Sequence, residues 1–397
     1  MENSGEFLYT CKIMPQNLAE ILTRGVEAIY PSREAFEAAL KAKKLTIYHG
    51  IDPTASSLHL GHLVVLRKLH QLQDLGHKII LLIGDFTARI GDPSQKLSAR
   101  RILSREEVLK NAKDYKDQAA KVLKFSGKNP AVIKFNSTWL SKLNFENVLK
   151  LMANFTVQQL LERDMFQIRI KAKKPINFTE LVYPLMQGYD SVALDVDAEI
   201  GGTDQTFNML IGRQLLKKYL RKEKFVVTCK LLTVGEVKMG KTESVFIPLS
   251  LTASDMFGKI MAQPDTVMSS FFELLTDVNQ KNWQKLAPIE TKKLLGGQIL
   301  TQLFSAKEAN LAKKEFEKTF QQYQVPQITP TFSPRGKSYG IINLLIESKL
   351  VPSKSEAKRL ISQGAIEVDK VKILNLKTQV KNGSIIRIGK YRFLKII

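Results

Sequence analysis

The first half of the chain alternates short apolar runs with longer segments of helical spacing. Leu45–Tyr48 reads as a strand, Leu60–Leu75 carries apolar residues at helical intervals, and Lys78–Ile83 reads as a second strand. Further strand-like runs occur at Ala131–Phe135 and Phe225–Cys229. Because a buried strand, a helix and another strand in this order form a βαβ unit, the pattern predicts an α/β domain with a parallel sheet.

The pattern changes in the second half of the chain. From Asp255 to about Tyr323 the strand signals vanish, and residues such as Phe271 and Leu274 recur at helical intervals among Lys, Glu and Gln. Residues 324–334 then contain three prolines in eleven positions. We predict a small helical domain followed by an extended linker.

The end of the chain combines two helical patterns with several short strand-like runs. Ser338–Ser348 and Ser353–Ser362 read as helices, and a Ser-x-x-Glu capping box at Ser353 and Glu356 opens the second. The strand-like runs and the turn-forming pairs between them are Ala365–Val368, Asp369-Lys370, Val371–Leu374, Asn382-Gly383, Ile385–Ile388, Gly389-Lys390 and Tyr391–Ile396. A compact module with two helices and a small sheet is expected.

Charge indicates what this protein binds. Its 397 residues include 60 Lys and Arg against 38 Asp and Glu, a formal net charge of +22. From Arg335 to Ile397 there are fourteen Lys and Arg against four Asp and Glu, a net charge of +10. A basic field attracts polyanions, so the tail is predicted to bind RNA. A generally basic proteome, or a solvated surface face, is the alternative interpretation.

Composition excludes several classes of protein. Apolar residues make up 44% and charged residues 25%, which is typical of a folded globular chain. Cys11 and Cys229 lie far apart and form neither a disulfide framework nor a metal-ligand spacing, so we expect no structural zinc. No apolar run approaches the roughly 20 residues of a membrane span, and the N-terminus lacks the blocks of a signal peptide. We therefore expect a cytoplasmic protein.

Two segments carry candidate phosphate chemistry. The histidine motif, His59-Leu60-Gly61-His62, opens the first helix after a strand, where backbone N–H groups and the helix dipole favour phosphate. Gly61 would let a nucleotide approach closely. The lysine segment, Lys238-Met239-Gly240-Lys241-Thr242, offers two ammonium groups for a pyrophosphate leaving group. Taken alone, the first could be a metal pair or a helix cap, and the second a solvated loop.

A third segment points to a small zwitterionic ligand. Tyr183, Gln187 and Asp190 fall at i, i+4 and i+7, which places a phenol, an amide and a carboxylate on one helix face. Such groups suit hydrogen bonding to an amino acid with a polar far end better than they suit a core. Pro184 would ordinarily disfavour a helix interior.

The paired histidine motif and lysine segment resemble the two signatures of class I aminoacyl-tRNA synthetases. Gly240 and Thr242 stand where the second signature, usually written KMSKS, has serines. Over most of the chain the resemblance is to tyrosyl-tRNA synthetases of the bacterial type. The motifs that carry it are Tyr48–Thr54, His59–His62, Gly84–Pro93, Tyr183–Asp190, Gly201–Gln205 and the lysine segment. The tail is similar to a small RNA-binding module shared with a ribosomal protein and some pseudouridine synthases.

The resemblance implies roles for individual residues. Those that hold tyrosine would be Tyr48 and Asp190 at its hydroxyl, Asp92, Tyr183 and Gln187 at its ammonium group, and Gln205 near its carboxylate. Those that bind ATP would be Gly50, Asp52, His59, Gly61, His62, Gly202, Asp204, Lys238 and Lys241. Those that act on the phosphates during catalysis would be Thr54, His59, His62, Lys238 and Lys241. Mg²⁺ would arrive with ATP as substrate, and no tightly bound cofactor or protein-held metal is expected.

The resemblance also implies an architecture and an activity. Residues 1–230 would form a Rossmann-type catalytic domain with a dimerisation insertion near Ala131–Phe155, and residues 231–323 the lysine segment and a helical anticodon-region domain. Residues 324–334 would be the linker and 335–397 the basic RNA-binding domain. The implied enzyme activates L-tyrosine with ATP, releases pyrophosphate and transfers tyrosine to the 3′ end of tRNA(Tyr) as a homodimer.

Three alternatives stay open at this point. A tryptophanyl enzyme shares the fold, although Tyr48 and Asp190 suit a phenol and such an enzyme usually lacks the basic tail. A catalytically silent RNA-binding protein descended from a synthetase would not need intact histidines and lysines. A small-molecule nucleotidyltransferase would use neither the helical domain nor the tail.

Overall fold

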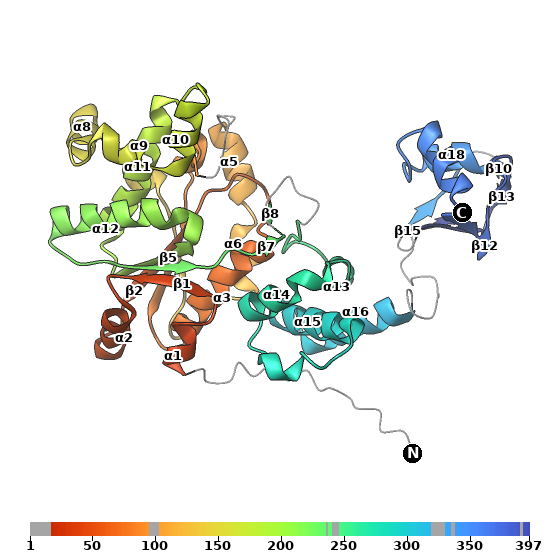
Figure 1. Cartoon of the computed structure of the whole chain (residues 1–397), viewed down its shortest axis with the longest axis horizontal. Helices are drawn as coiled ribbons and strands as arrows, with labels where there is room; N and C mark the ends of the chain where they lie inside the picture. The colour runs from red at the N-terminus through yellow and green to blue at the C-terminus, as the bar shows by residue number, and fades with distance from the viewer. Residues whose placement is uncertain are drawn as a thin grey trace, which may run out of the picture. The chain divides into compact units, whose positions relative to one another are not determined.

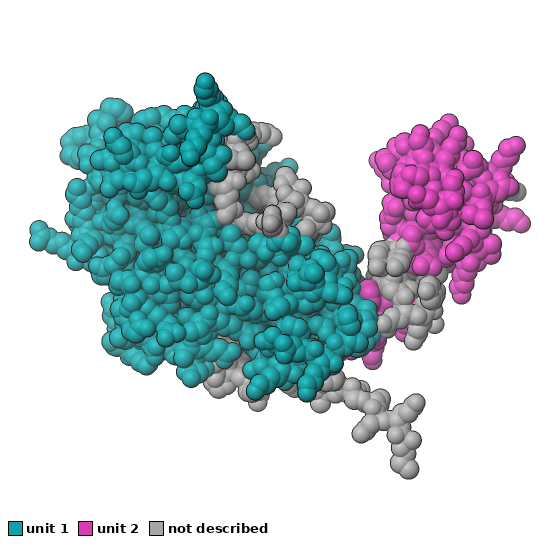
Figure 2. Space-filling view, viewed as in Figure 1, with its two compact units in different colours: residues 1–309 teal, residues 310–397 magenta. Residues whose placement is uncertain are grey.

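The computed structural model describes residues 17–94, 103–235, 237–239, 246–318, 330–334, 338–389 and 392–397. The chain divides into two compact units, Met1–Ala309 and Asn310–Ile397 (Figures 1 and 2). Within these described ranges no helix is long and apolar enough to cross a membrane.

A six-stranded sheet organises the first unit. Its order is β1-β6-β5-β2-β3-β4, and only β1 runs antiparallel, against β6. The strands are β1 (Val26–Tyr30), β2 (Thr46–Ile51), β3 (Lys78–Ile83), β4 (Val132–Phe135), β5 (Ala198–Gly202) and β6 (Phe225–Cys229). The α/β fold with a parallel sheet is therefore confirmed. Most residues of the central strands β2 and β3 are buried, which is why both contain apolar runs in the sequence.

The winding of the sheet places a ligand site at its centre. The helix α3 (Leu60–Asp74) connects β2 to β3, and α12 (Thr206–Leu220) connects β5 to β6, so the two crossovers leave the pair β2–β5 in opposite directions. Since such crossovers are right-handed, the two helices lie on opposite faces of the sheet (Figure 1). Ligands of doubly wound sheets bind at the carboxyl ends of the strands where this reversal occurs.

Helix α11 (Phe178–Leu194) carries the predicted ligand face and packs closely on α12. Asn177 and Glu180 form a capping box at its start, and the helix continues through Pro184. A Cβ on Gly188 would stand only 3.1 Å from the backbone nitrogen of Gly212 in α12. The absence of that atom lets the two helices approach each other.

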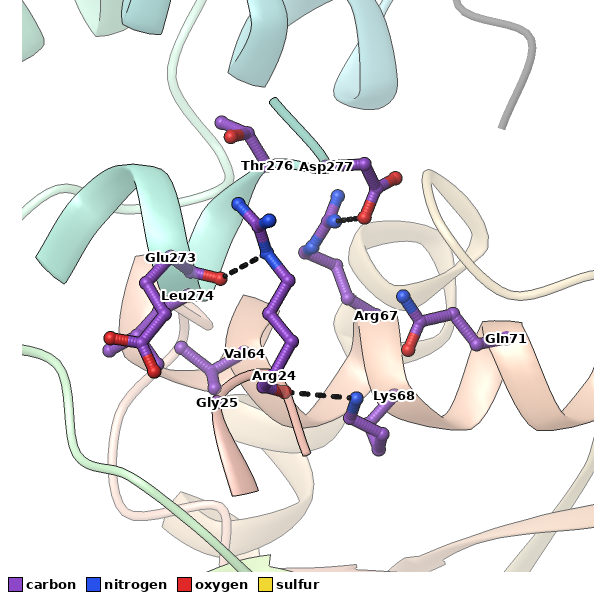
Figure 3. A pocket seen from close by; sticks show the side chains of 10 residues that line it. All are labelled: Arg24, Gly25, Val64, Arg67, Lys68, Gln71, Glu273, Leu274, Thr276 and Asp277. Carbon is purple, nitrogen blue, oxygen red and sulfur yellow. Dashed lines mark hydrogen bonds and ion pairs between the residues drawn. The ribbon is translucent and has the colours of Figure 1, made fainter. Parts of the chain in front are cut away.

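The predicted helical region is also present in the first unit. It contains α13 (Ala253–Met261), α14 (Met268–Leu275), α15 (Pro288–Leu303) and the start of α16 (Ala306–Phe316). Between α1 (Leu18–Ile21) and β1, Arg24 donates hydrogen bonds to the carbonyls of Phe272, Glu273 and Val278 at 2.9 to 3.0 Å. Arg67 of α3 pairs with Asp277 at 2.6 Å (Figure 3). These contacts join the helix that begins at the histidine motif to the helical region.

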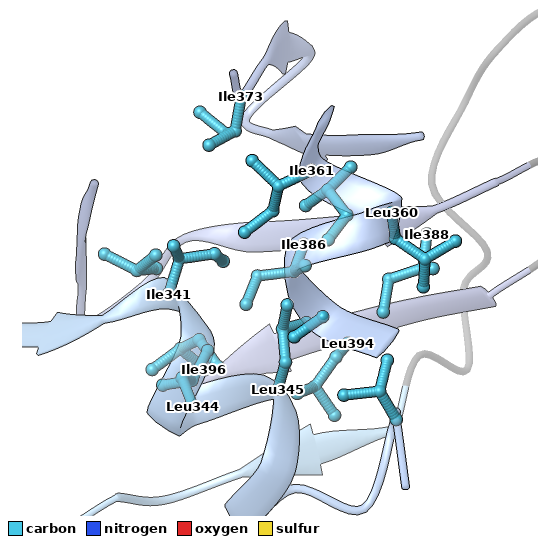
Figure 4. Close-up of a cluster of buried hydrophobic side chains, with 14 residues drawn as sticks. Ile341, Leu344, Leu345, Leu360, Ile361, Ile373, Ile386, Ile388, Leu394 and Ile396 are labelled. Atoms are coloured by element: carbon cyan, nitrogen blue, oxygen red, sulfur yellow. The ribbon is translucent and has the colours of Figure 1, made fainter. Parts of the chain in front are cut away.

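The second unit has its own core between two helices and a five-stranded sheet of order β12-β11-β14-β15-β9 (Figure 4). The helices are α17 (Ile341–Glu347) and α18 (Lys354–Ser362), and the strands are β9 (Thr331–Phe332), β11 (Ile366–Val368), β12 (Val371–Lys372), β14 (Ile385–Ile388) and β15 (Arg392–Ile396). A separate pair joins β10 (Ser338–Gly340) to β13 (Gln379–Lys381). The predicted α+β module is confirmed.

Local details of the second unit differ from the sequence prediction at several places, among them β13, which was not predicted. Residues Ser338–Gly340 form β10, so the first helix begins three residues later than predicted. Thr331 and Phe332, near the end of the predicted linker, pair in parallel with β15. Ser353 caps α18 by accepting the Glu356 N–H at 3.3 Å, while the Glu356 carboxylate pairs with Arg359.

Candidate active site

A buried phenol and a buried carboxylate meet beneath the carboxyl ends of the central strands. Tyr48 of β2 is fully buried and Asp190 of α11 is 2% exposed. Trp139 of α7 (Ser137–Leu140) donates its Nε1–H to one oxygen of Asp190 at 2.7 Å, and Asn136 donates to the other at 3.2 Å. Burial raises the pKa of Asp190 well above its ordinary value, and the two donors oppose that shift. The carboxylate is thus oriented as an acceptor.

A buried hydrogen-bond network of charged and polar groups contacts the Tyr48 hydroxyl. Its hydroxyl lies 2.8 Å from the Ser191 hydroxyl, which also accepts a hydrogen bond from Lys224 at 2.8 Å. Lys224 in turn pairs with Glu199 of β5, and both side chains are buried. Burial, followed by the negative charges of Glu199 and Asp190, raises the pKa of the Tyr48 phenol well above its ordinary value, so this hydroxyl keeps its proton.

A second polar group forms where β2 ends. The Tyr183 hydroxyl donates to one oxygen of Asp52 at 2.8 Å, and the Thr87 hydroxyl donates to the other at 2.6 Å. Because its proton points to Asp52, the Tyr183 oxygen is oriented to accept a hydrogen bond from a cation. The resemblance implies that Asp52 binds ATP, and in the structure its carboxylate contacts Tyr183, a residue predicted to hold the ammonium group.

Three further predicted residues form one connected network. Gln205 donates to Asp92 at 2.7 Å, and Asn208 of α12 donates to Gln187 at 2.9 Å and to Gln205 at 3.0 Å. Ser94 donates its backbone N–H and its hydroxyl to the other Asp92 oxygen. The predicted ammonium and carboxylate positions of the ligand therefore lie side by side. We had not predicted Asn208 or Ser94 as members of this site.

The two histidines share one tautomer. The Gly61 N–H donates to Nδ1 of His59 at 3.1 Å, and the His59 N–H donates to Nδ1 of His62 at 3.2 Å. A nitrogen that accepts carries no proton, so each neutral ring holds its proton on Nε2 and presents it as a donor. Their ring centroids lie 4.0 Å apart. Such paired donors suit the oxygens of a phosphate.

The histidine motif lies against Met239 of the lysine segment and against residues that follow this segment in the chain. A Cβ on Gly61 would lie 3.8 Å from the carbonyl oxygen of Met239. Beyond the segment, the Phe246 ring lies 5.4 Å from the His59 ring, and Leu60 donates its N–H to the Ile247 carbonyl at 3.1 Å. The two motifs, about 180 residues apart in the sequence, are brought together.

Of the lysine segment itself, the structure describes only part. Lys241, Gly240 and Thr242 lie outside the described residues. For Lys238 the backbone alone is described, in β8 (Val237–Lys238), which pairs with β7 (Thr233–Val234). The proposed roles of both lysines stay predictions.

The remaining predicted residues lie along the same edge of the sheet. Gly50 is in β2, Thr54 follows that strand, Gly202 ends β5, and Asp204 lies in the short helix Thr203–Gln205. A Cβ on Gly202 would stand 2.6 Å from the Asp204 carboxylate. A Cβ on Gly61 would stand 2.8 Å from the His59 ring, so this glycine makes room for the histidine itself and not only for a ligand.

Metal ligands are not assembled in the described part of the chain. No group of three or more His, Cys, Asp and Glu residues placed to hold a metal ion occurs there.

Comparison with known proteins identifies the family. Residues 40–329 match the model of tRNA synthetases class I (W and Y), and residues 315–395 match the tyrosine–tRNA ligase SYY-like C-terminal domain. A tyrosine–tRNA ligase of Carboxydothermus hydrogenoformans is 44% identical over 403 residues, covering 95% of this chain and 97% of that protein. One from Aquifex aeolicus is 40% identical over 391 residues, covering 96% of this chain and 99% of that protein.

Solved structures agree on the fold. A C-terminally truncated mitochondrial tyrosyl-tRNA synthetase of Aspergillus nidulans superposes with a TM-score of 0.65 at 20% identity, over 76% of this chain and 93% of that one. The counterpart from Coccidioides posadasii gives 0.62 at 22% identity, over 75% and 90%. Together with the sequence relatives, these matches confirm the resemblance inferred from the motifs. The chain belongs to the class I tRNA synthetases, in the family of the tyrosine–tRNA ligases.

Proposed function

We propose that this site joins tyrosine to ATP as an adenylate and that the chain then transfers tyrosine to its tRNA. The observation that carries the proposal is that the Tyr48–Asp190 pair and the histidine motif lie at the same sheet edge, with Met239 of the lysine segment and Phe246, which follows that segment, against the motif. One end of the site suits a phenol and the other suits phosphates.

Selection of tyrosine would take place at its hydroxyl. Asp190 accepts a hydrogen bond from the ligand, and Tyr48 contributes its own hydroxyl. A phenylalanine ring would leave both buried groups without a partner, which reduces its use by roughly 10⁴ to 10⁵. Tyr183, Gln187 and Asp92 hold the ammonium group, and Gln205, which already contacts Asp92, lies near the ligand carboxylate.

Activation needs positioning more than a protein nucleophile. The ligand carboxylate attacks the α-phosphorus of ATP, the bond to the bridging oxygen breaks, and pyrophosphate leaves with Mg²⁺ as a substrate ion. His59 and His62 donate from Nε2 to phosphate oxygens, while Thr54, Lys238 and Lys241 act on the departing pyrophosphate. Gly50, Gly202 and Asp204 line the adenosine side.

The basic second unit would hold tRNA during the transfer step. Its sequence from Arg335 onward carries a net charge of +10, which favours a polyanion. The first 334 residues hold every residue that we assign to the chemistry. The domain boundaries and the cytoplasmic location expected from the sequence stay predictions.

A homodimer is proposed from exposed apolar side chains in the predicted insertion and just beyond it. Val132 is 44% exposed, Leu149 48%, Phe178 63% and Phe145 76%. Large apolar side chains with this much exposure are typical of a subunit interface. Sedimentation of a Phe145→Asp variant should yield monomers, and Leu311→Asp, which changes a residue 56% exposed in α16, is the matched control. An unchanged dimer in Phe145→Asp would place the interface elsewhere.

Charging of tRNA tests the proposed activity directly. The full chain, ATP, Mg²⁺, labelled tyrosine and bacterial tRNA should give acid-precipitable tyrosyl-tRNA. Labelled tryptophan in place of tyrosine is the comparison. Charging with tryptophan alone, or with neither, would overturn the proposal.

A further inference from the structure

The buried pair formed by Lys224 and Glu199 has no part in the function proposed so far. The exposed fraction is 0% for the Lys224 side chain and 3% for Glu199. Removing two charges from water is costly, and their attraction offsets that loss only with good geometry and further hydrogen bonds. A pair of this kind, next to a residue that contacts the substrate, therefore calls for a local explanation.

The surroundings of Lys224 are shaped to hold its ammonium group. A Cβ on Gly212 of α12 would lie 2.6 Å from Nζ of Lys224 and 2.7 Å from the Ser191 hydroxyl. The absence of a side chain at Gly212 provides the space for both groups. The ammonium also lies 5.7 Å from the centre of the Tyr48 ring. Two helices and two strands thus converge on this group.

The chemistry of these groups determines the direction of their hydrogen bonds. An ammonium group only donates, so Ser191 accepts from Lys224 at 2.8 Å. In the arrangement that we infer, the Ser191 proton points to the Tyr48 oxygen, which lies 2.8 Å away, and this agrees with the lowering effect of Ser191 on the pKa of the phenol. Tyr48 consequently accepts from Ser191 and has its own proton for the ligand. At the other end of the ligand hydroxyl, Trp139 and Asn136 each donate a hydrogen bond to Asp190. These bonds favour its ionised form, which can only accept hydrogen bonds.

Glu199 attracts the Tyr48 proton and would do so more strongly if Lys224 were missing. Its charge and its hydrogen bonding both raise the pKa of the phenol. In the structure, one Glu199 oxygen is paired with Lys224 and the other lies 3.5 Å from the Gln187 amide. Lys224 therefore acts on Tyr48 in two ways, by donating to Ser191 and by occupying Glu199.

We propose that Lys224 and Ser191 are positioning residues that fix a one-way hydrogen-bond chain from Lys224 through Ser191 and Tyr48 to the tyrosine hydroxyl and on to Asp190. The inference rests on the proposed function and explains how that site recognises the hydroxyl group of tyrosine. Aligned bonds of this kind polarise one another. With the chain reversed, Tyr48 and Asp190 would both be acceptors for the single proton of the ligand, and one hydrogen bond would be lost.

The first test is Ser191→Ala, which interrupts the chain and leaves the Lys224–Glu199 pair in place. We expect the preference for tyrosine over phenylalanine in pyrophosphate exchange to fall about 3- to 10-fold, the equivalent of one neutral hydrogen bond. The KM for tyrosine should rise and the KM for ATP should stay constant. The control is Lys222→Met, which removes the two ion pairs of a neighbouring lysine whose side chain is 28% exposed, and it should change neither quantity.

A second variant keeps the test decisive if Ser191→Ala folds poorly. Lys224→Met with Glu199→Gln removes both charges together, and thermal melting checks that the protein is folded. Reduced preference in either folded variant supports the chain, and unchanged preference in both overturns it. If the unaltered protein shows no exchange with tyrosine at all, the proposed function fails, and that result is distinct from failure of this inference.

Discussion

Replacing Trp139 by Phe should weaken tyrosine binding through Asp190. Phe retains most of the packing of Trp139 against Tyr48, Leu82 and Val196, but it lacks the Nε1–H that donates to Asp190 at 2.7 Å. A hydrogen bond to a charged group contributes about 1.5 to 3 kcal/mol. Because this donor opposes the effect of burial, its loss should raise the pKa of Asp190 further above its ordinary value.

Two kinetic changes should follow in pyrophosphate exchange. The KM for tyrosine should rise about 10-fold with little change in the KM for ATP. The acidic limb of the pH profile should also move to higher pH, because activity falls as Asp190 becomes protonated. The matched control is Trp283→Phe, which changes the other tryptophan, stacked on Phe272 with ring centroids 4.8 Å apart. A Trp139→Phe profile that coincides with the control would refute the role given to Asp190.

Three further predictions test other parts of the molecule. His59→Ala or Thr54→Ala should slow adenylate formation with little change in tyrosine affinity, and unchanged pre-steady-state rates in both would reject their phosphate roles. Deleting Arg335–Ile397 should leave pyrophosphate exchange largely intact and weaken tRNA charging, so equal charging by the shortened chain would contradict the role of the tail. Burial lowers the pKa of His77 to about 4, so its neutral form stabilises the fold above pH 6.5 and this stability is lost as the pH falls from 6.5 toward 4. In His77→Gln, the loss of unfolding free energy between pH 6.5 and 4 should be smaller by about 1 to 2 kcal/mol, as measured by urea unfolding at several pH values. An unchanged pH dependence of stability would argue against this role of His77.

Strong local patterns allowed the central fold to be predicted from the sequence. Strands β3 and β6 have the predicted bounds, because buried parallel strands form apolar runs. The strand β2 begins one residue later than predicted and ends three residues later, at Ile51. The strand β5 was missed because Ala-Glu-Ile-Gly-Gly has weak strand propensity and two glycines. Its pairing with β2 and β6 outweighs that propensity.

The residues that contact the ligand were easier to predict than the residues that orient them. Tyr183, Gln187 and Asp190 share one helix, so their spacing is visible in the sequence. Trp139 lies 51 positions from Asp190, and Lys224 lies 33 positions from Ser191. Contacts at such separation leave no periodic signal. Asn136 could have been suspected, because it directly follows a predicted strand whose carboxyl end faces the site.

Pyrophosphate exchange with each of three amino acids is the most direct test of the central claim. The full chain would be assayed with ATP and tyrosine, tryptophan or phenylalanine, without tRNA. The account predicts exchange with tyrosine and a rate lower by roughly 10⁴ or more with phenylalanine, since Tyr48 and Asp190 would stay unpaired. Comparable exchange with phenylalanine or tryptophan, or no exchange with any of the three, would contradict it.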